Sequence, residues 1–132
     1  MLRIPQAIYD TIIDHAREGF PLEVCGILGG LEGEVSIQFP MTNVDASSEH
    51  FTLDPKEQFR VIKELRSRKL EMVAVYHSHP ASPARPSAED IRLALTPDIS
   101  HVIVSLVEPD TPVLKSFRIT GGVVEPEEIS LI

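Results

Sequence analysis

The sequence predicts a single α/β domain of the α+β type, in which helices and strands follow one another along the chain. Three observations lead to this prediction. Two segments, 4–18 and 54–68, carry apolar residues at helical spacing. Short apolar runs between turn residues are typical of strands, and the chain has several: 24–31, 34–39, 72–76, 101–107 and 113–119. The length of 132 residues fits one hydrophobic core, so we expect residues 1–132 to form one domain.

The chain opens with a predicted helix over residues 4–18. Pro5 suits the first helical position, and Gly19 suits the end. Apolar residues recur at helical spacing and indicate a face that packs on the core: Ile8, Ile12, Ile13 and Ala16. His15 lies on the same helix, but a single histidine without a partner at metal-ligand spacing is expected to be a surface residue.

A hairpin and a loop follow this helix. The runs 24–31 and 34–39 are separated by only a Glu-Gly turn, which predicts two antiparallel strands. Cys25 has apolar neighbours in the first strand, so we interpret it as a small buried residue and not as a nucleophile. Residues 40–52 show no periodicity and are expected to form a loop, in which His50 is interpreted as exposed or locally hydrogen-bonded.

A second helix and a buried strand lead to the centre of the sequence. Asp54, Pro55 and Glu57 are typical of a helix start, and the helix should continue to about residue 68. Its apolar residues are expected to face the core: Phe59, Val61, Ile62 and Leu65. The apolar run that follows predicts a buried strand.

The last third of the chain adds a helix and two strands. Ser87 suits the cap of a helix through residues 94 and 95 that ends before Pro97, because a residue that precedes proline disfavours helical backbone. A short connection joins the next two strand runs and predicts antiparallel pairing, and a turn at Gly121 leads to a final segment. We expect His101 to be a hydrogen-bonded or exposed residue at the end of its strand.

Composition argues against several classes of protein. The net charge of -8 disfavours nucleic acid as a partner, because an acidic surface repels phosphate. With one cysteine, the chain cannot form an intramolecular disulfide. The sequence has no signal peptide and no apolar run near the roughly 18 residues of a membrane span, so we expect a soluble cytoplasmic protein. These observations do not indicate whether the chain is a monomer or an oligomer.

A pair of histidines directly follows the central strand. Side chains alternate along a strand, so His77 and His79 point to the same side and can share one metal ion, while Ser78 points away. Three prolines stiffen the next loop, which could bring Asp90 back as a third, anionic ligand. Two histidines and one carboxylate suit zinc, and three protein ligands leave a fourth position for water, as in catalytic zinc sites.

Hydrolysis also needs a group that takes a proton from the water and returns it. Glu89 is next to Asp90 on the predicted helix and faces about 100° away from it, so we interpret Glu89 as a solvated acid in the first turn. Glu23 is the better candidate, because it stands at the start of an apolar, glycine-containing strand. A carboxylate there, if it lies beside the metal, would be poised as general base and acid.

These residues form a known pattern, and the chain resembles the JAMM, or MPN-plus, zinc metalloproteases, a family that includes deubiquitinases. The family motif is a distant Glu, then His-x-His-Pro and, after a fixed spacing, Ser-x-x-Asp. Glu23 stands upstream, and seven residues from Pro80 to Pro86 separate His77-Ser78-His79 from Ser87-Ala88-Glu89-Asp90. The motif residues are therefore all present at the family's spacing.

The resemblance implies a fold and a division of roles. The implied fold is a mixed, mostly antiparallel sheet flanked by helices, similar to cytidine deaminases. One zinc would be bound by His77, His79 and Asp90. Glu23 would act as general acid and base on the zinc water, and Ser87 would hydrogen-bond the developing oxyanion.

The resemblance also implies a substrate, because the chain is most similar to stand-alone prokaryotic members that release cysteine from the C-terminus of a ubiquitin-fold sulfur-carrier protein. The similarity extends to Pro40-Met41-Thr42-Asn43. The proline after His79 is shared with isopeptidases, so an alternative is a desampylase-like or deubiquitinase-like activity on carrier conjugates. A second alternative is an MPN-minus scaffold that binds partners without zinc, although such members lack the metal ligands. A phage-tail or cell-wall peptidase, which normally carries another domain, is a third.

Overall fold

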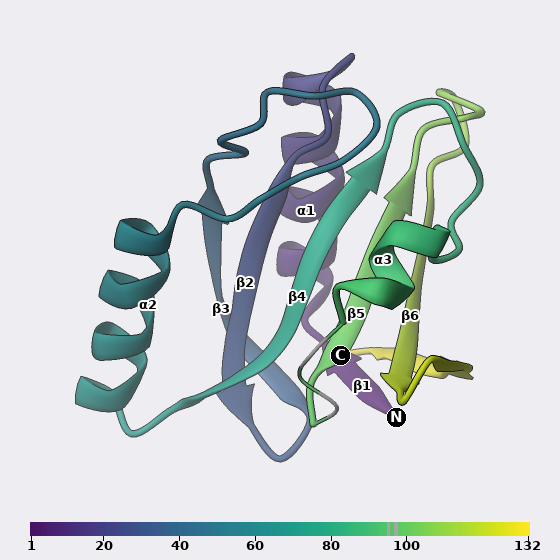
Figure 1. Cartoon of the computed structure of the whole chain (residues 1–132). Coiled ribbons are helices and arrows are strands. Elements are labelled where there is room, and N and C mark those ends of the chain that lie inside the picture. The colour runs from purple at the N-terminus through teal and green to yellow at the C-terminus, as the bar shows by residue number, and fades with distance from the viewer. Residues whose placement is uncertain (95, 97) are drawn as a thin grey trace.

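In the computed structural model, the chain forms one sheet with helices on both faces (Figure 1). The structure describes residues 1–94, 96 and 98–132. In chain order the elements are β1 (Leu2–Ile4), α1 (Gln6–Gly19), β2 (Cys25–Leu31), β3 (Glu34–Met41), α2 (Pro55–Ser67), β4 (Glu71–His79), α3 (Ala88–Arg92), β5 (Ser100–Ser105), β6 (Val113–Thr120), β7 (Val123–Glu127) and β8 (Ile129–Leu131). The predicted α+β class is confirmed.

The strands of the described residues form a single sheet in the order β7-β6-β5-β4-β2-β3-β1-β8. The predicted β2–β3 hairpin is present, and β4 pairs antiparallel with β2 and parallel with β5. The sheet is therefore mixed and mostly antiparallel, as expected. Only Glu128 separates β7 from β8, although these strands are the two ends of the strand order. The sheet must therefore curl until its edges meet at this residue.

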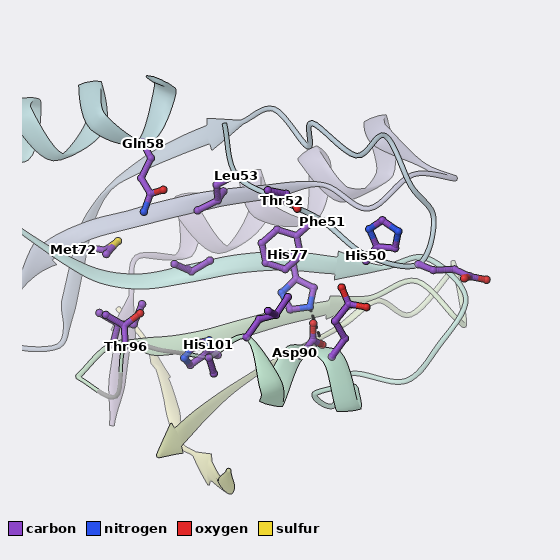
Figure 2. Close-up of a pocket in the computed structure, with 16 residues that line it drawn as sticks. His50, Phe51, Thr52, Leu53, Gln58, Met72, His77, Asp90, Thr96 and His101 are labelled. Atoms are coloured by element: carbon purple, nitrogen blue, oxygen red, sulfur yellow. Dashed lines mark hydrogen bonds and ion pairs between the residues drawn. The ribbon is translucent and has the colours of Figure 1, made fainter. Parts of the chain in front are cut away.

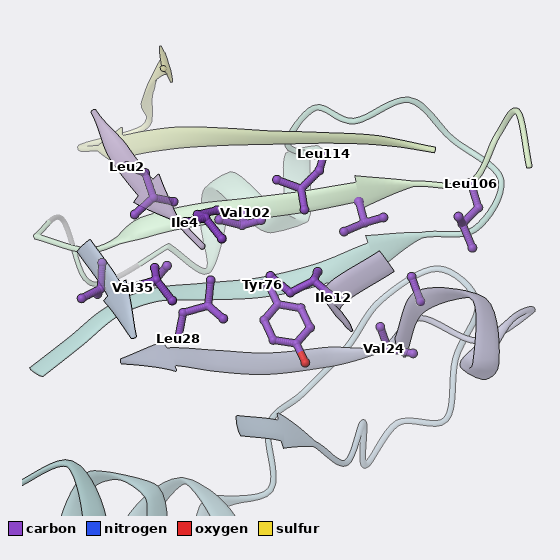
Figure 3. Packing of buried hydrophobic residues seen from close by; sticks show 14 residues of the cluster. Leu2, Ile4, Ile12, Val24, Leu28, Val35, Tyr76, Val102, Leu106 and Leu114 are labelled. Atoms are coloured by element: carbon purple, nitrogen blue, oxygen red, sulfur yellow. The ribbon is translucent and has the colours of Figure 1, made fainter. Parts of the chain in front are cut away.

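The two faces of the sheet pack against different helices. On one face, Ile12 and Ala16 of α1 join a buried cluster with strand residues such as Tyr76 (Figure 3). On the other face, Val61 and Leu65 of α2 belong to a second cluster. Figure 1 shows α2 and α3 on the same side of the sheet, with β4 between them. Alternate residues of β4 therefore face α1 or the space between α2 and α3.

Tyr76 connects α1 to the sheet. Its side chain is fully buried, and its hydroxyl oxygen accepts a hydrogen bond of 3.0 Å from the Gln38 amide. The same oxygen lies 2.8 Å from Nδ1 of His15, whose ring meets Tyr76 edge-on. His15 is therefore half-buried and bonded to the core, rather than fully at the surface as expected, and it does not belong to the group of possible metal ligands. Burial lowers the pKa of His15, which keeps the imidazole neutral against the core.

Some element boundaries differ from the prediction. Residues 2–4 form β1, so α1 begins at Gln6 and not at residue 4. β1 pairs with β8, and each of these strands has only 3 residues, which is too short to produce a periodic pattern. β4 continues to His79, so the two histidines lie within the strand rather than beyond its end.

The helices show two further differences. Phe59 was expected in the core but is 64% exposed, because α2 packs through Val61 and Leu65 and Phe59 is about 200° around the helix from Val61. α3 ends at Arg92, earlier than predicted. Leu95, in the predicted continuation, and Pro97, before which the helix was expected to stop, lie outside the described residues. None of the described helices is long and apolar enough to cross a membrane.

Candidate metal centre

The end of β4 and the start of α3 bring three ligand atoms together. Nε2 of His77 lies 3.1 Å from Nε2 of His79, and each nitrogen lies 3.2 Å from Oδ2 of Asp90. Both histidines are 5% exposed. Figure 2 shows His77 and Asp90 pointing toward each other from the strand and the helix. The predicted convergence of these three side chains is present, and the group could hold a metal ion.

Strand geometry sets the direction of the two histidines. β4 is hydrogen-bonded to β2 on one side and to β5 on the other, which fixes its backbone. His77 and His79 project from one face, as the alternation predicts. Ser78 projects from the other face, where its hydroxyl accepts a hydrogen bond of 2.8 Å from the Val24 N–H.

The loop after β4 turns Asp90 back toward the strand. Ser105 Oγ donates to the Ser82 carbonyl at 2.6 Å, and Ala84 is buried in a small core cluster. Ser87 then caps α3 in a reciprocal pair with Asp90: the Asp90 N–H donates to Ser87 Oγ, and the Ser87 N–H donates to Asp90 Oδ2. The same oxygen faces both histidines, so the cap holds the ligand in position.

The donor set fits a metal cation. His79 Nδ1 lies 2.9 Å from the Pro83 carbonyl oxygen, which can only accept, so the proton of neutral His79 is on Nδ1. In this neutral form Nε2 directs a lone pair at the Asp90 oxygen, and either a proton on Nε2 or a metal cation between these atoms removes the repulsion. Ligand atoms at about 2.0–2.1 Å from a tetrahedral zinc are roughly 3.3 Å apart, close to the 3.1–3.2 Å separations of this site.

The pKa shifts of Asp90 and His77 favour the forms that bind a metal, whereas that of His79 favours a proton that a metal ion would displace. Burial alone would raise the pKa of Asp90, but hydrogen bonds with His77 and His79 hold this pKa well below its ordinary value. Burial lowers the pKa of His77. Burial acts in the same direction on His79, but the contacts with Asp90 and the Pro83 carbonyl outweigh it and raise the pKa. An ionised carboxylate and a neutral imidazole are the forms that coordinate metals.

Glu23 lies at the edge of this site. Cys25 pairs with His77 across β2 and β4, so continuing the antiparallel register by two residues puts Glu23 opposite His79. Glu23 is 5% exposed, and its Oε1 is buried without a hydrogen-bond partner among the described residues. Burial raises the pKa of Glu23 to about 7, with the His79 charge opposing and the Asp90 charge adding to the shift. A carboxyl group with this pKa can take up and release protons near neutral pH.

This raised pKa predicts that Glu23→Gln stabilises the metal-free protein. The folded state holds the Glu23 proton more tightly than the unfolded state, whose pKa is near 4.5. The contribution of this proton to the stability of the wild type is therefore fully present below pH 4.5 and is lost as the pH rises through about 7. We expect the metal-free variant to be more stable than the wild type at about pH 8, by up to about 3 kcal/mol, and equally stable at about pH 4.5. Urea unfolding at both pH values measures this difference, and equal stability at both would contradict it.

Ser87 and Glu89, the hydroxyl and the second acid considered in the sequence, lie at the start of α3. Ser87 is exposed, and since its oxygen accepts the Asp90 N–H, its own hydroxyl proton can be donated elsewhere. Glu89 is partly exposed in the first turn of the helix. This placement agrees with the interpretation of Glu89 as a first-turn acid rather than a member of the ligand group.

The remaining histidines and the cysteine are outside the ligand group. Cys25 is buried, as predicted, and burial raises its pKa to about 12, which disfavours the thiolate. His50 is exposed and hydrogen-bonded to Asp45 at 3.0 Å. His101 is partly buried near the start of β5 and has a backbone hydrogen bond with Thr96, in agreement with the expected hydrogen-bonded histidine, although its Nε2 has no partner among the described residues.

A pocket of about 470 Å³ opens beside the ligand atoms (Figure 2). His77 and Asp90 line it together with residues of the loop before α2, such as Phe51. The Phe51 ring stacks on the His77 ring, with the ring centres 4.5 Å apart and the planes at 25°. The sequence did not identify this contact, because it joins residues that are distant in the chain and leaves no local pattern.

A second contact that the sequence did not identify involves Asn43. Its side-chain amide donates hydrogen bonds to the carbonyl oxygens of Glu23, at 3.1 Å, and His50, at 3.0 Å. Sequence reasoning had placed Asn43 only within a stretch shared with similar proteins. Asn43 is only partly buried, and a polar side chain in an aperiodic loop signals such a role only once its partners are known.

The chain is similar to several known proteins along most of its length. A family model described as prokaryotic homologs of the JAB domain matches residues 5–120. The CysO-cysteine peptidase of Mycobacterium tuberculosis is 36% identical over 134 residues, an alignment that covers 100% of this chain and 92% of that protein. The desampylase of Haloferax volcanii is 38% identical over 103 residues, covering 73% of this chain and 74% of that protein.

The fold also has a close counterpart among solved structures. The solution structure of a protein from Desulfitobacterium hafniense superimposes with a TM-score of 0.92 and 45% identity, covering 100% of this chain and 93% of that chain. The family match spans most of the sequence, including Glu23, both histidines and Asp90. The chain therefore belongs to the prokaryotic homologs of the JAB domain, within the JAMM/MPN proteases.

Proposed function

We propose that residues 1–132 form one zinc-dependent peptidase domain that hydrolyses an amide bond at the C-terminus of a ubiquitin-fold sulfur-carrier protein. In this proposal His77, His79 and Asp90 hold one zinc. Glu23 is the general base and acid, and Ser87 assists the oxyanion. The observation that carries the proposal is the convergence of three ligand atoms within 3.2 Å of one another beside an open pocket. Three protein ligands leave a coordination position free for chemistry.

The chain's own residues supply the proton transfers. A bound zinc contributes Lewis-acid chemistry, polarising the scissile carbonyl and making a water more acidic. Glu23, whose buried Oε1 has no partner among the described residues, takes a proton from the attacking water. It then delivers that proton to the nitrogen of the leaving amine. The Ser87 hydroxyl donates a hydrogen bond to the carbonyl oxygen as negative charge develops there.

The substrate class is supported by the names of the relatives. The peptidase of Mycobacterium tuberculosis is named for CysO-cysteine, and it aligns with the whole of this chain. On this ground we favour release of cysteine from a carrier C-terminus. The desampylase match covers 73% of the chain and supports a second candidate, cleavage of an isopeptide bond between a carrier and another protein.

One assay compares the two candidates. The zinc-loaded protein is mixed with a ubiquitin-fold carrier extended by a C-terminal cysteine, and separately with the same carrier joined to a lysine side chain. We expect the cysteine-extended carrier to be cleaved with the higher kcat/KM, by roughly ten-fold or more, as read by mass spectrometry. The reverse preference would favour the isopeptidase function, and cleavage of neither by zinc-loaded protein would remove the carrier as substrate.

A further inference from the structure

We propose that Asn43 is a positioning residue for Glu23, holding the proposed general base in register with the metal ligands. This inference rests on the proposed function of Glu23. Glu23 lies just outside the strand β2, which begins at Cys25. The neighbouring Val24 is still hydrogen-bonded to Ser78 of β4 through its N–H and its carbonyl, but the N–H and carbonyl of Glu23 itself find their partners elsewhere in the chain.

The loop between β3 and α2 supplies these contacts. The Glu23 N–H donates to the Ser47 carbonyl at 2.8 Å, and the Glu23 carbonyl accepts from the Asn43 amide at 3.1 Å. Both backbone groups of Glu23 are therefore bound to one loop. The Glu23 side chain has an oxygen without a partner among the described residues, so its direction depends on this backbone anchoring.

Asn43 is the centre of that loop. Its Nδ2 donates to the carbonyls of Glu23 and His50, and its Oδ1 accepts the N–H groups of Asp45, at 3.1 Å, and Thr52, at 3.2 Å. All four partners are backbone atoms, two acceptors facing the NH₂ group and two donors facing the oxygen. This pattern fixes the orientation of the amide, because a flipped amide would face carbonyls with its oxygen.

The same loop also reaches a metal ligand. Phe51 follows His50 directly, and its ring stacks on the ring of His77. At the other end of the loop, Glu57 of α2 accepts hydrogen bonds from the Thr42 N–H and hydroxyl at 2.8 and 2.9 Å. By holding the Glu23 and His50 carbonyls together, Asn43 links the proposed base to the side chain that packs on a ligand. Displacing reacting groups by about 1 Å can reduce a rate about 100-fold.

Two variants and a matched control test this role. Asn43→Ala removes all four bonds, whereas Asn43→Asp keeps the acceptor for the Asp45 and Thr52 N–H groups and places a carboxylate oxygen, which cannot donate, against the Glu23 and His50 carbonyls. Asp45→Ala is the control, because Asp45 accepts from His50 and Thr52 side chains in the same loop without contacting Glu23. Each is assayed with zinc bound, on the carrier extended by cysteine.

We expect both Asn43 variants to lose kcat by roughly 10- to 100-fold with KM and zinc content nearly unchanged. Asp45→Ala should keep kcat within about two-fold. If Asn43→Ala does not fold, as judged by circular dichroism, Asn43→Asp decides. A kcat equal to that of the wild type in a folded Asn43 variant would overturn the proposal, as would an equal loss in the Asp45 control.

A double-mutant cycle separates positioning from a general structural effect. If Asn43 acts through Glu23, adding Asn43→Ala to Glu23→Gln should lower the residual rate by less than about two-fold, because the interaction is already lost. If Asn43→Ala lowers the rate of Glu23→Gln by as large a factor as it lowers the rate of the wild type, the proposal is contradicted. Failure of the proposed function itself looks different, since Glu23→Gln would then leave hydrolysis unchanged.

Discussion

Replacing Glu23 by glutamine is expected to lower turnover by roughly 10²- to 10⁴-fold while the protein keeps its zinc. Glutamine has nearly the same shape but cannot accept the proton of the attacking water or return it to the leaving amine. The predicted loss corresponds to about 3–5 kcal/mol of activation barrier. Zinc should stay, because Glu23 is not one of the three residues whose ligand atoms converge. Single-turnover hydrolysis and elemental analysis of the same sample measure both properties.

Glu89→Gln is the matched control for this experiment. Glu89 also has a carboxylate that lines the pocket beside His77 and Asp90, so this variant makes the same chemical change at a neighbouring position. We expect its kcat to stay within about three-fold of the wild type, since its carboxylate is a first-turn acid of α3. Equal losses in the two variants would mean that the overall negative charge of the site matters, and not a proton transfer at Glu23.

The ligand group could be predicted from the sequence because it depends on local geometry. His77 and His79 are two residues apart on a strand, so their shared direction follows from the alternation of side chains. Ser87 and Asp90 form a capping pair whose spacing is visible in the sequence. Glu23 is far from the histidines in the chain. Its position at the start of an apolar, glycine-containing strand made it a candidate, and the family resemblance then implied its role.

Features that depend on tertiary contacts could not be predicted in this way. Phe59 has the helical spacing of a core residue, yet the direction from which α2 meets the sheet leaves it exposed. β1 and β8 pair with each other from opposite ends of the chain, and neither is long enough to show a period. The role of Asn43 depends on backbone groups of Glu23 and His50, which no pattern in its own loop reveals.

Asp90→Ala is expected to abolish stable zinc binding, from about one ion per chain to almost none. Asp90 is the only anionic member of the ligand group among the described residues, and its Oδ2 contacts both histidine nitrogens. Removing it leaves two neutral ligands, which bind zinc weakly unless a third completes the site. Elemental analysis after dialysis measures the metal content, and Glu89→Ala, a change of the same charge on the adjacent residue, should keep its zinc.

Thermal unfolding gives an independent measure of the same loss. A metal that binds only the folded chain stabilises it by about 4 kcal/mol at a free concentration 1,000 times the Kd. The wild type should therefore melt at a higher temperature with zinc than with a chelator, and Asp90→Ala should melt at the same temperature in both. Its melting point should also lie below that of the chelated wild type, because Asp90 accepts the Ser87 N–H that caps α3. If the Asp90→Ala variant still binds one zinc, Asp90 is not a required ligand and its role is only to cap α3. Metal content and stability together therefore separate its two roles.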